Sequence, residues 1–226
     1  MKSHQWGQLF DANIETYRGA RPKRAEYVLD FIRSSGCDVH SILEMGAFSG
    51  KDIRYLAKRL KESLCCSLDR EQAVFDRAAR DATSCVVADA FRMPFCDKAF
   101  GITFHSGLIV VFDDRQSRAI IEEQLRVTSG YAIVFAHNRW NFIDIMVSAI
   151  RRARGNSLFR YRRFSKGLLR QLVPAHVDIV RIDYVDNMLV NVTRRRAPWL
   201  LKPVSRIAGL MDMLLCNEVV VIVRAS

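Results

Sequence analysis

The chain lacks several features that would assign a sequence to a class at once. No apolar run approaches the roughly 18–20 residues that a membrane-spanning helix needs. The first residues, Met1 to Asp11, lack the apolar core of a secretory signal. Neither an internal repeat nor a low-complexity linker interrupts the 226 residues. These absences predict a soluble, intracellular and hence cytoplasmic protein made of one domain.

Metal-binding cysteine patterns are also missing. The six cysteines stand at positions 37, 65, 66, 85, 96 and 216, and no two of them form a C-x-x-C pair. No spacing between histidine and cysteine matches a zinc site, so we expect no metal. Cys65, Cys66 and Cys85 lie in or beside short apolar runs, where a reduced cysteine serves as a small buried apolar residue.

Acidic residues are scarce in the last third of the chain. Residues 139–226 hold 16 basic and 6 acidic side chains, whereas residues 1–138 hold 19 and 18. Such an asymmetry is typical of contact with an anionic partner. We favour a solvated basic face whose arginine stems cover the core. The alternatives are peripheral contact with an anionic membrane, anchored by Trp199, Leu200 and Leu201, and nucleic-acid binding, for which no RRM-type aromatic motif is present.

Short apolar runs alternate with amphipathic stretches from Ser41 to Val134, a pattern that indicates repeated βαβ units. We therefore expect a Rossmann-like α/β fold. The expected strands are 41–45, 63–68, 84–88, 100–105, 131–136, 176–184 and 218–224. The expected helices are 51–61, 71–80, one capped by Asp113 or Asp114 that ends near 127, then 138–153, 164–172 and a helical stretch within 198–215.

Acidic residues and glycines gather where three of these strands end. The run from Ile42 to Gly50 leads an apolar strand through Glu44 into a glycine-containing turn, where backbone N–H groups can approach a ligand. Asp69 follows 19 residues after Gly50, at the end of the next strand, and suits a ribose-binding carboxylate. Asp89 ends the third strand. Three carboxylates at one sheet edge fit a nucleoside ligand.

Taken in order, these segments resemble the class I S-adenosylmethionine-dependent methyltransferases, in particular their type 11-like small-molecule group. Glu44 to Gly50 resembles the family's first motif, Ser67-Leu68-Asp69 its ribose-binding segment, and Asp89 to Phe95 its adenine-binding segment. The resemblance covers roughly residues 10–138 and implies a mostly parallel seven-stranded sheet with helices on both faces. It divides the single domain into N-terminal lid helices (1–38), a cofactor-binding core (39–138), a basic helical cap with strand six (139–215) and a last strand (216–226).

The resemblance also implies a site. S-adenosyl-L-methionine, with S-adenosyl-L-homocysteine as product, is expected to contact Tyr17, Glu44, Gly46, Ala47, Phe48, Gly50, Asp69, Arg70, Asp89, Ala90, Phe91 and His105. His105 and His137, each at the end of a strand, are the candidate catalytic residues. Trp6 and Tyr17 are candidate lid residues.

Several positions depart from the family pattern. Phe48 replaces the middle glycine of the first motif, Gly101 stands where the family often has Asp, Val110-Val111 replaces Glu-His, and Tyr131 replaces a second glycine. The resulting hypothesis is methyl transfer to a small-molecule acceptor, acidic or lipid-linked. An RNA methyltransferase that uses the basic last third, or a non-catalytic cofactor-binding protein, remains open.

Overall fold

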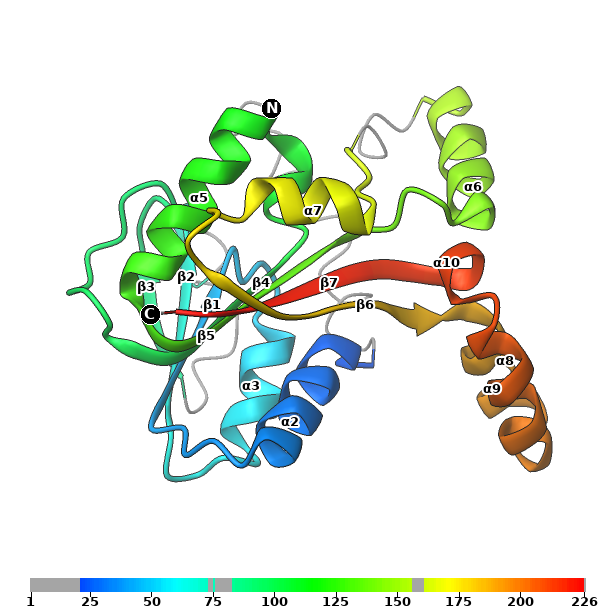
Figure 1. The fold of residues 1–226 in the computed structure, drawn as a ribbon, viewed down its shortest axis with the longest axis horizontal. Coiled ribbons are helices and arrows are strands. Elements are labelled where there is room, and N and C mark those ends of the chain that lie inside the picture. Colours follow the sequence, from blue (N-terminus) through cyan, green and yellow to red (C-terminus); the bar gives the residue numbers. More distant parts are fainter. Residues whose placement is uncertain (1–20, 73–74, 76–82, 156–160, 226) are drawn as a thin grey trace.

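A computed structural model of the protein describes residues 21–72, 75, 83–155 and 161–225 (Figure 1). Trp6 and Tyr17, the two candidate lid residues, and most of the helix expected at 71–80 lie outside these residues.

One seven-stranded sheet forms the centre of the molecule, in the order β3-β2-β1-β4-β5-β7-β6. β7 runs antiparallel to both neighbours and the other pairs are parallel, which confirms the expected fold class. The strands are β1 (Ser41–Met45), β2 (Leu64–Asp69), β3 (Ser84–Val87), β4 (Phe100–Ser106), β5 (Thr128–His137), β6 (Asp178–Asn187) and β7 (Cys216–Arg224).

Helices cover both faces of this sheet (Figure 1). α2 (Lys23–Ser35) and α3 (Lys51–Ala57) lie on one face, and α5 (Asp114–Val127) and α7 (Lys166–Leu172) lie on the other. The short helix η1 (Ile109–Val111) follows β4. The remaining helices lie at the end of the sheet where β6 ends and β7 begins: α6 (Phe142–Ala153), α8 (Met188–Arg196), η3 (Pro198–Leu200), α9 (Leu201–Gly209) and α10 (Asp212–Leu215).

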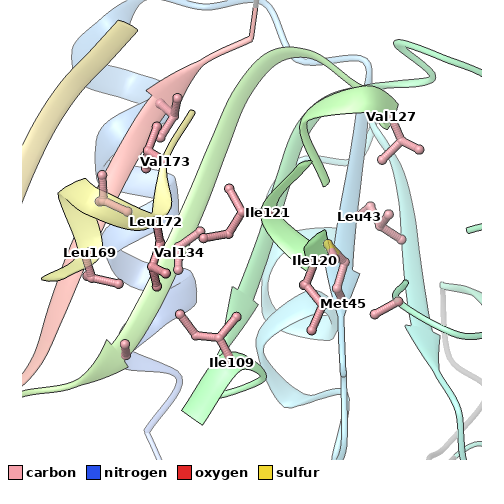
Figure 2. Close-up of a cluster of buried hydrophobic side chains, with 14 of the residues drawn as sticks. Leu43, Met45, Ile109, Ile120, Ile121, Val127, Val134, Leu169, Leu172 and Val173 are labelled. Atoms are coloured by element: carbon pink, nitrogen blue, oxygen red, sulfur yellow. The ribbon is translucent and has the colours of Figure 1, made fainter. Parts of the chain in front are cut away.

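The central strands are apolar on both faces because both faces are covered. Ile42 packs with α2 and α3, whereas its neighbour Leu43 packs with α5. In β5, Ile133 likewise packs on the α2 and α3 side and Val134 on the α5 side. Figure 2 shows the cluster on the α5 side, where Leu169 and Leu172 of α7 meet Val134. Two buried layers therefore hold the strand ends in fixed register.

Most expected elements form within a few residues of their predicted limits, because local signals set them. Asp113 caps α5, and its side chain and that of Gln116 form a reciprocal capping box. α6 begins at Phe142 and not at 138, because Asn141 accepts a hydrogen bond from Asp144 N–H and so caps the helix. α8 was not expected, and Cys85 is exposed on the edge strand β3 while Cys65 and Cys66 are buried.

Within the described residues, no helix is long and apolar enough to cross a membrane, and no cluster of three potential metal-ligating side chains occurs.

The close approach of β4 and β5 at Gly130 gives a stability prediction. A Cβ on Gly130 would lie 2.5 Å from the carbonyl oxygen of Gly101, where the β4–β5 register shifts. Gly130→Ala should therefore lower the free energy of unfolding by about 1–3 kcal/mol in urea denaturation, since backbone must move to admit the methyl group. Gly209→Ala is the matched control, because no atom lies within 4 Å of its Cβ position. The control should be neutral or slightly stabilising, and equal losses in both variants would contradict the prediction.

Candidate functional site

The carboxyl ends of the parallel strands meet at one edge of the sheet. In the strand register, Met45 of β1 pairs with Leu68 of β2 on one side and with His105 of β4 on the other. His105 in turn pairs with Val134 of β5. Residues directly after these positions therefore share an edge, which is where open α/β sheets bind ligands.

The loop after β1 keeps a glycine-like backbone although its middle residue is phenylalanine. Gly46, Phe48 and Gly50 have φ angles of 63°, 48° and 60°, all in the left-handed region. For a residue with a Cβ this conformation costs roughly 1–2 kcal/mol. Phe48 thus retains the backbone shape of the glycine that the resemblance led us to expect.

Asp69, at the end of β2, holds this loop in place. Its Oδ2 accepts a hydrogen bond of 3.0 Å from Phe48 N–H, and its Oδ1 accepts one of 3.1 Å from Glu71 N–H. Burial raises the pKa of the Asp69 carboxyl, and these backbone donors oppose the rise. Each carboxylate oxygen has a second lone pair, so the group can still accept hydrogen bonds from a ligand.

Glu44 lies deeper than Asp69. It is 4% exposed, and its Oε2 accepts a hydrogen bond of 3.0 Å from Ile53 N–H in the first turn of α3. Burial and the charge of the nearby Asp52 raise the pKa of Glu44 well above its usual range. In this structure the Glu44 carboxyl therefore fixes the start of α3 against the end of β1.

The segment after β3 forms a second polar turn at the same edge. Asp89 Oδ1 accepts a hydrogen bond of 3.0 Å from Phe91 N–H, and the buried Ala90 lies between them. Arg70, just after β2, places its guanidinium 4.0 Å from Asp89 Oδ2. The structure therefore places Asp69, Arg70 and Asp89 close together at this edge.

His105 is fully buried at 0% exposure, and no described residue hydrogen-bonds either ring nitrogen. Burial alone lowers the pKa of the His105 imidazole to about 3, so the ring is neutral at pH 7. A neutral imidazole has one donor and one acceptor nitrogen, and burying both without partners costs about 1–3 kcal/mol each.

His137 lies in a more polar setting at the end of β5. Its ring stacks on Tyr161 with centroids 4.1 Å apart, and its cross-strand partner is Glu218 of β7. Burial lowers the pKa of His137, the Glu218 carboxylate opposes this shift, and the Arg24 guanidinium adds to it.

Arg24 and Glu218 were missed by sequence reasoning. The Arg24 Nε donates to Glu218 Oε1 at 2.9 Å and to Oε2 at 3.1 Å, and its Nη2 also donates to Oε1. Burial lowers the pKa of Arg24, but the neighbouring Glu218 carboxylate raises it by more, so Arg24 stays charged. The two residues are 194 positions apart, and they meet because α2 packs on the face of the sheet that includes β7.

A cleft of about 250 Å³ opens beside this ion pair. α2, β5, the end of β6 and the start of α8 form its walls, which include Tyr27, Phe135, Asn187, Val190, Arg194 and Glu218. Because Glu218 also pairs with His137, the cleft adjoins the strand-end edge on the side away from β3. The cleft therefore lies at the same edge of the sheet as the polar turns that hold Asp69 and Asp89.

No family model and no curated protein sequence matches the chain. Solved structures do match in three dimensions. An S-adenosylmethionine-dependent methyltransferase from Archaeoglobus fulgidus is 14% identical with a TM-score of 0.60, over 93% of this chain and 96% of that one. Magnesium protoporphyrin IX methyltransferase from Synechocystis PCC 6803, with bound S-adenosylhomocysteine, is 9% identical with a TM-score of 0.62, over 90% of this chain and 82% of that one.

A third similar structure is the geranyl diphosphate C-methyltransferase from Streptomyces coelicolor A3(2), solved in complex with Mg²⁺, geranyl diphosphate and S-adenosylhomocysteine. It is 17% identical, with a TM-score of 0.60 over 90% of this chain and 78% of that one. At identities this low, the likeness is evidence for a shared fold alone. Strand order, strand direction and these likenesses agree that the chain has the Rossmann-like fold of the class I methyltransferases.

Proposed function

We propose that the protein is an S-adenosylmethionine-dependent methyltransferase that acts on a small-molecule acceptor. The observation that carries the proposal is the Asp69 carboxylate, which anchors the left-handed loop through Phe48 N–H at the same edge as Asp89. The structural likeness to methyltransferases that are named for small-molecule acceptors supports it.

The residues at the edge fit the cofactor because their carboxylate oxygens can accept hydrogen bonds from its hydroxyl and amino groups. The remaining lone pairs of Asp69 suit the two ribose hydroxyls, and Asp89 Oδ2 and the Phe91 backbone suit the adenine. The loop backbone at Gly46, Ala47 and Gly50 would lie close to the cofactor. Arg70, beside Asp89, would lie next to the adenine. Glu44 positions the α3 start, and a contact of Glu44 with the cofactor stays a prediction, as does that of Tyr17.

When bound, S-adenosylmethionine supplies an electrophilic methyl group on a sulfonium. The protein then has to orient the acceptor and exclude water. Burial keeps the His105 ring neutral, but a pKa of about 3 makes it a poor base at pH 7, so its catalytic role would be to orient the acceptor as a neutral hydrogen-bonding group. The lowered pKa of His137 likewise favours its neutral form, which makes His137 the candidate proton acceptor. We assign the acceptor to the cleft of about 250 Å³ beside Glu218, a volume that admits a small molecule.

One observation favours the alternative of a non-catalytic cofactor-binding protein. Phe48 places a phenylalanine side chain where the family has a glycine. Cofactor binding without turnover, across a panel of small oxygen, nitrogen and carbon acceptors, would favour that alternative.

Cofactor binding should depend on Asp69. In calorimetric titration with S-adenosylmethionine and S-adenosylhomocysteine, Asp69→Asn should weaken binding about 10- to 100-fold, the usual effect of losing hydrogen bonds to a charged group. Asp38→Asn is the control, because Asp38 is an exposed carboxylate that precedes β1 at the opposite edge. Wild-type protein that binds neither compound, or equal affinity in both variants, would refute the proposed cofactor site.

The backbone of the loop predicts a difference between two variants at one position. The free energy of unfolding of Phe48→Gly should be about 1–2 kcal/mol higher than that of Phe48→Ala. Alanine keeps a Cβ at a φ of 48°, whereas glycine has none. Comparing these two variants removes the contribution of the ring, which both lack. Urea denaturation with equal stabilities would show that the loop does not hold the left-handed conformation.

The buried His105 predicts a pH dependence of stability. Its pKa is about 3 in the folded protein and about 6.5 when unfolded, so the unfolded state binds the extra proton between these values. Its contribution is present above about pH 6.5 and is lost as the pH falls toward 3, by roughly 1.4 kcal/mol per pH unit. Between pH 7 and pH 5, His105→Gln should therefore lose about 2 kcal/mol less unfolding free energy than wild type. Identical losses in urea titrations would mean that the ring is not buried as described.

A further inference from the structure

Large apolar side chains are exposed mainly at one end of the molecule. Of the 16 such side chains in the described residues, 13 belong to α6, the residue pair before it, and the segment from α8 to α10. They are Trp140, Phe142, Ile145, Met146, Ile150, Leu189, Val192, Trp199, Leu200, Ile207, Leu210, Met211 and Met213. We call these residues the apolar end. Many large apolar side chains exposed at one end of a domain often mark a contact with another molecule.

α6 is turned with its polar side toward the protein. Asp144 forms an ion pair with Arg163 at 2.8 Å, and the buried Ser148 hydroxyl lies 3.1 Å from the Tyr161 hydroxyl. Phe142, Ile145, Met146 and Ile150 repeat at helical spacing on the exposed side. The apolar stripe of a helix in a soluble domain normally faces the core. In the described part of the chain, nothing buries this stripe.

In the segment from α8 to α10, too, apolar side chains face outward and polar ones face the protein. Thr193 is buried in α8, whereas Val192 beside it is half exposed. Trp199 is 76% exposed and Leu210 is 89% exposed. Both helical groups lie at the end of the sheet where β6 ends (Figure 1).

The charges around the apolar end are almost all positive. Three arginines, 151, 152 and 154, lie at the end of α6, and three more, 194 to 196, end α8. α9 adds Lys202 and Arg206. The acidic residues of residues 139–155 and 188–215 are Asp144 and Asp212, and each is bonded inward, to Arg163 and to Asn187 at 2.8 Å. An anionic surface would therefore meet no exposed negative charge on these helices.

We propose that the apolar end docks the protein on an anionic lipid bilayer, with α6 and the α8–α9 segment lying in its interface. Aliphatic, methionine and tryptophan side chains enter the apolar layer, and arginines contact the anionic headgroups. A second copy of the chain would bring two basic surfaces together. A nucleic acid would leave the aliphatic side chains without an apolar partner, because it is gripped by phosphate contacts and aromatic stacking.

Vesicle sedimentation tests this docking, and it requires no methyl transfer, so its failure would leave the proposed function intact. Wild-type protein should bind vesicles of phosphatidylcholine with 30% phosphatidylserine at 0.1 M salt, and at least 10-fold more weakly to pure phosphatidylcholine, since the headgroup attraction is lost. The double variant Trp199→Ser with Leu210→Ser should bind the mixed vesicles at least 10-fold more weakly than wild type.

Two further variants separate the apolar and the charge contributions. Replacing Arg194, Arg195 and Arg196 by Gln should reduce the preference for phosphatidylserine, whereas Leu64→Ser, an exposed leucine at the start of β2, should change nothing. All the replaced side chains are exposed, so the fold should persist, which circular dichroism can check.

Three results would overturn the proposal. They are absence of binding to mixed vesicles, binding that the Trp199–Leu210 variant retains in full, and a dimer in light scattering that this variant converts to monomer. Retention of single-stranded RNA that survives the apolar substitutions, without vesicle binding, would assign the basic helices to nucleic acid instead.

Discussion

The parallel pairing of β1 with β2 and β4 is the constraint on which the rest of the site depends. It sets Met45, Leu68 and His105 side by side, so the loops that follow begin at one level. The hydrogen bond from Phe48 N–H to Asp69 spans two of these loops and exists only because the register is fixed. The two apolar layers in turn prevent a slip, since a shift of one residue would turn Ile42 and Leu43 to the wrong faces.

A group of charged side chains lies under α2, and its members pair with one another and shift one another's pKa. Arg24 is held by Glu218, and its charge lowers the pKa of Asp52 while burial raises it. Asp52 accepts a long hydrogen bond of 3.4 Å from Ala25 N–H and so ties α3 to α2. Breaking such a buried network by removing one partner usually costs several kcal/mol, because the other charge remains. The cleft beside Glu218 therefore has walls that are fixed by electrostatics as well as by packing.

Sequence predicted what local signals determine. β1 has its predicted limits, and the Asp113 cap and the strand-end positions of Asp69 and Asp89 follow from their immediate neighbours. What it missed depends on distant parts of the chain. The Arg24–Glu218 pair depends on how α2 packs against the sheet beside β7, and the outward turn of the α6 stripe is decided by Arg163 and Tyr161. α8 lacks an apolar period strong enough to predict, since its last turn is three arginines and Thr193 is its buried residue.

The position of β7 between β5 and β6 has a consequence for the order of folding. β5 is complete by His137 and β6 by Asn187, yet neither pairs with the other, because each pairs with Cys216–Arg224. A nascent chain that stops short of Cys216 therefore leaves the edge of β5 open and β6 without any partner. Unpaired apolar strands of this kind invite association with other chains. The sheet reaches its full seven strands only when these nine residues have been synthesised, so β6 must wait for the strand that follows it in the chain.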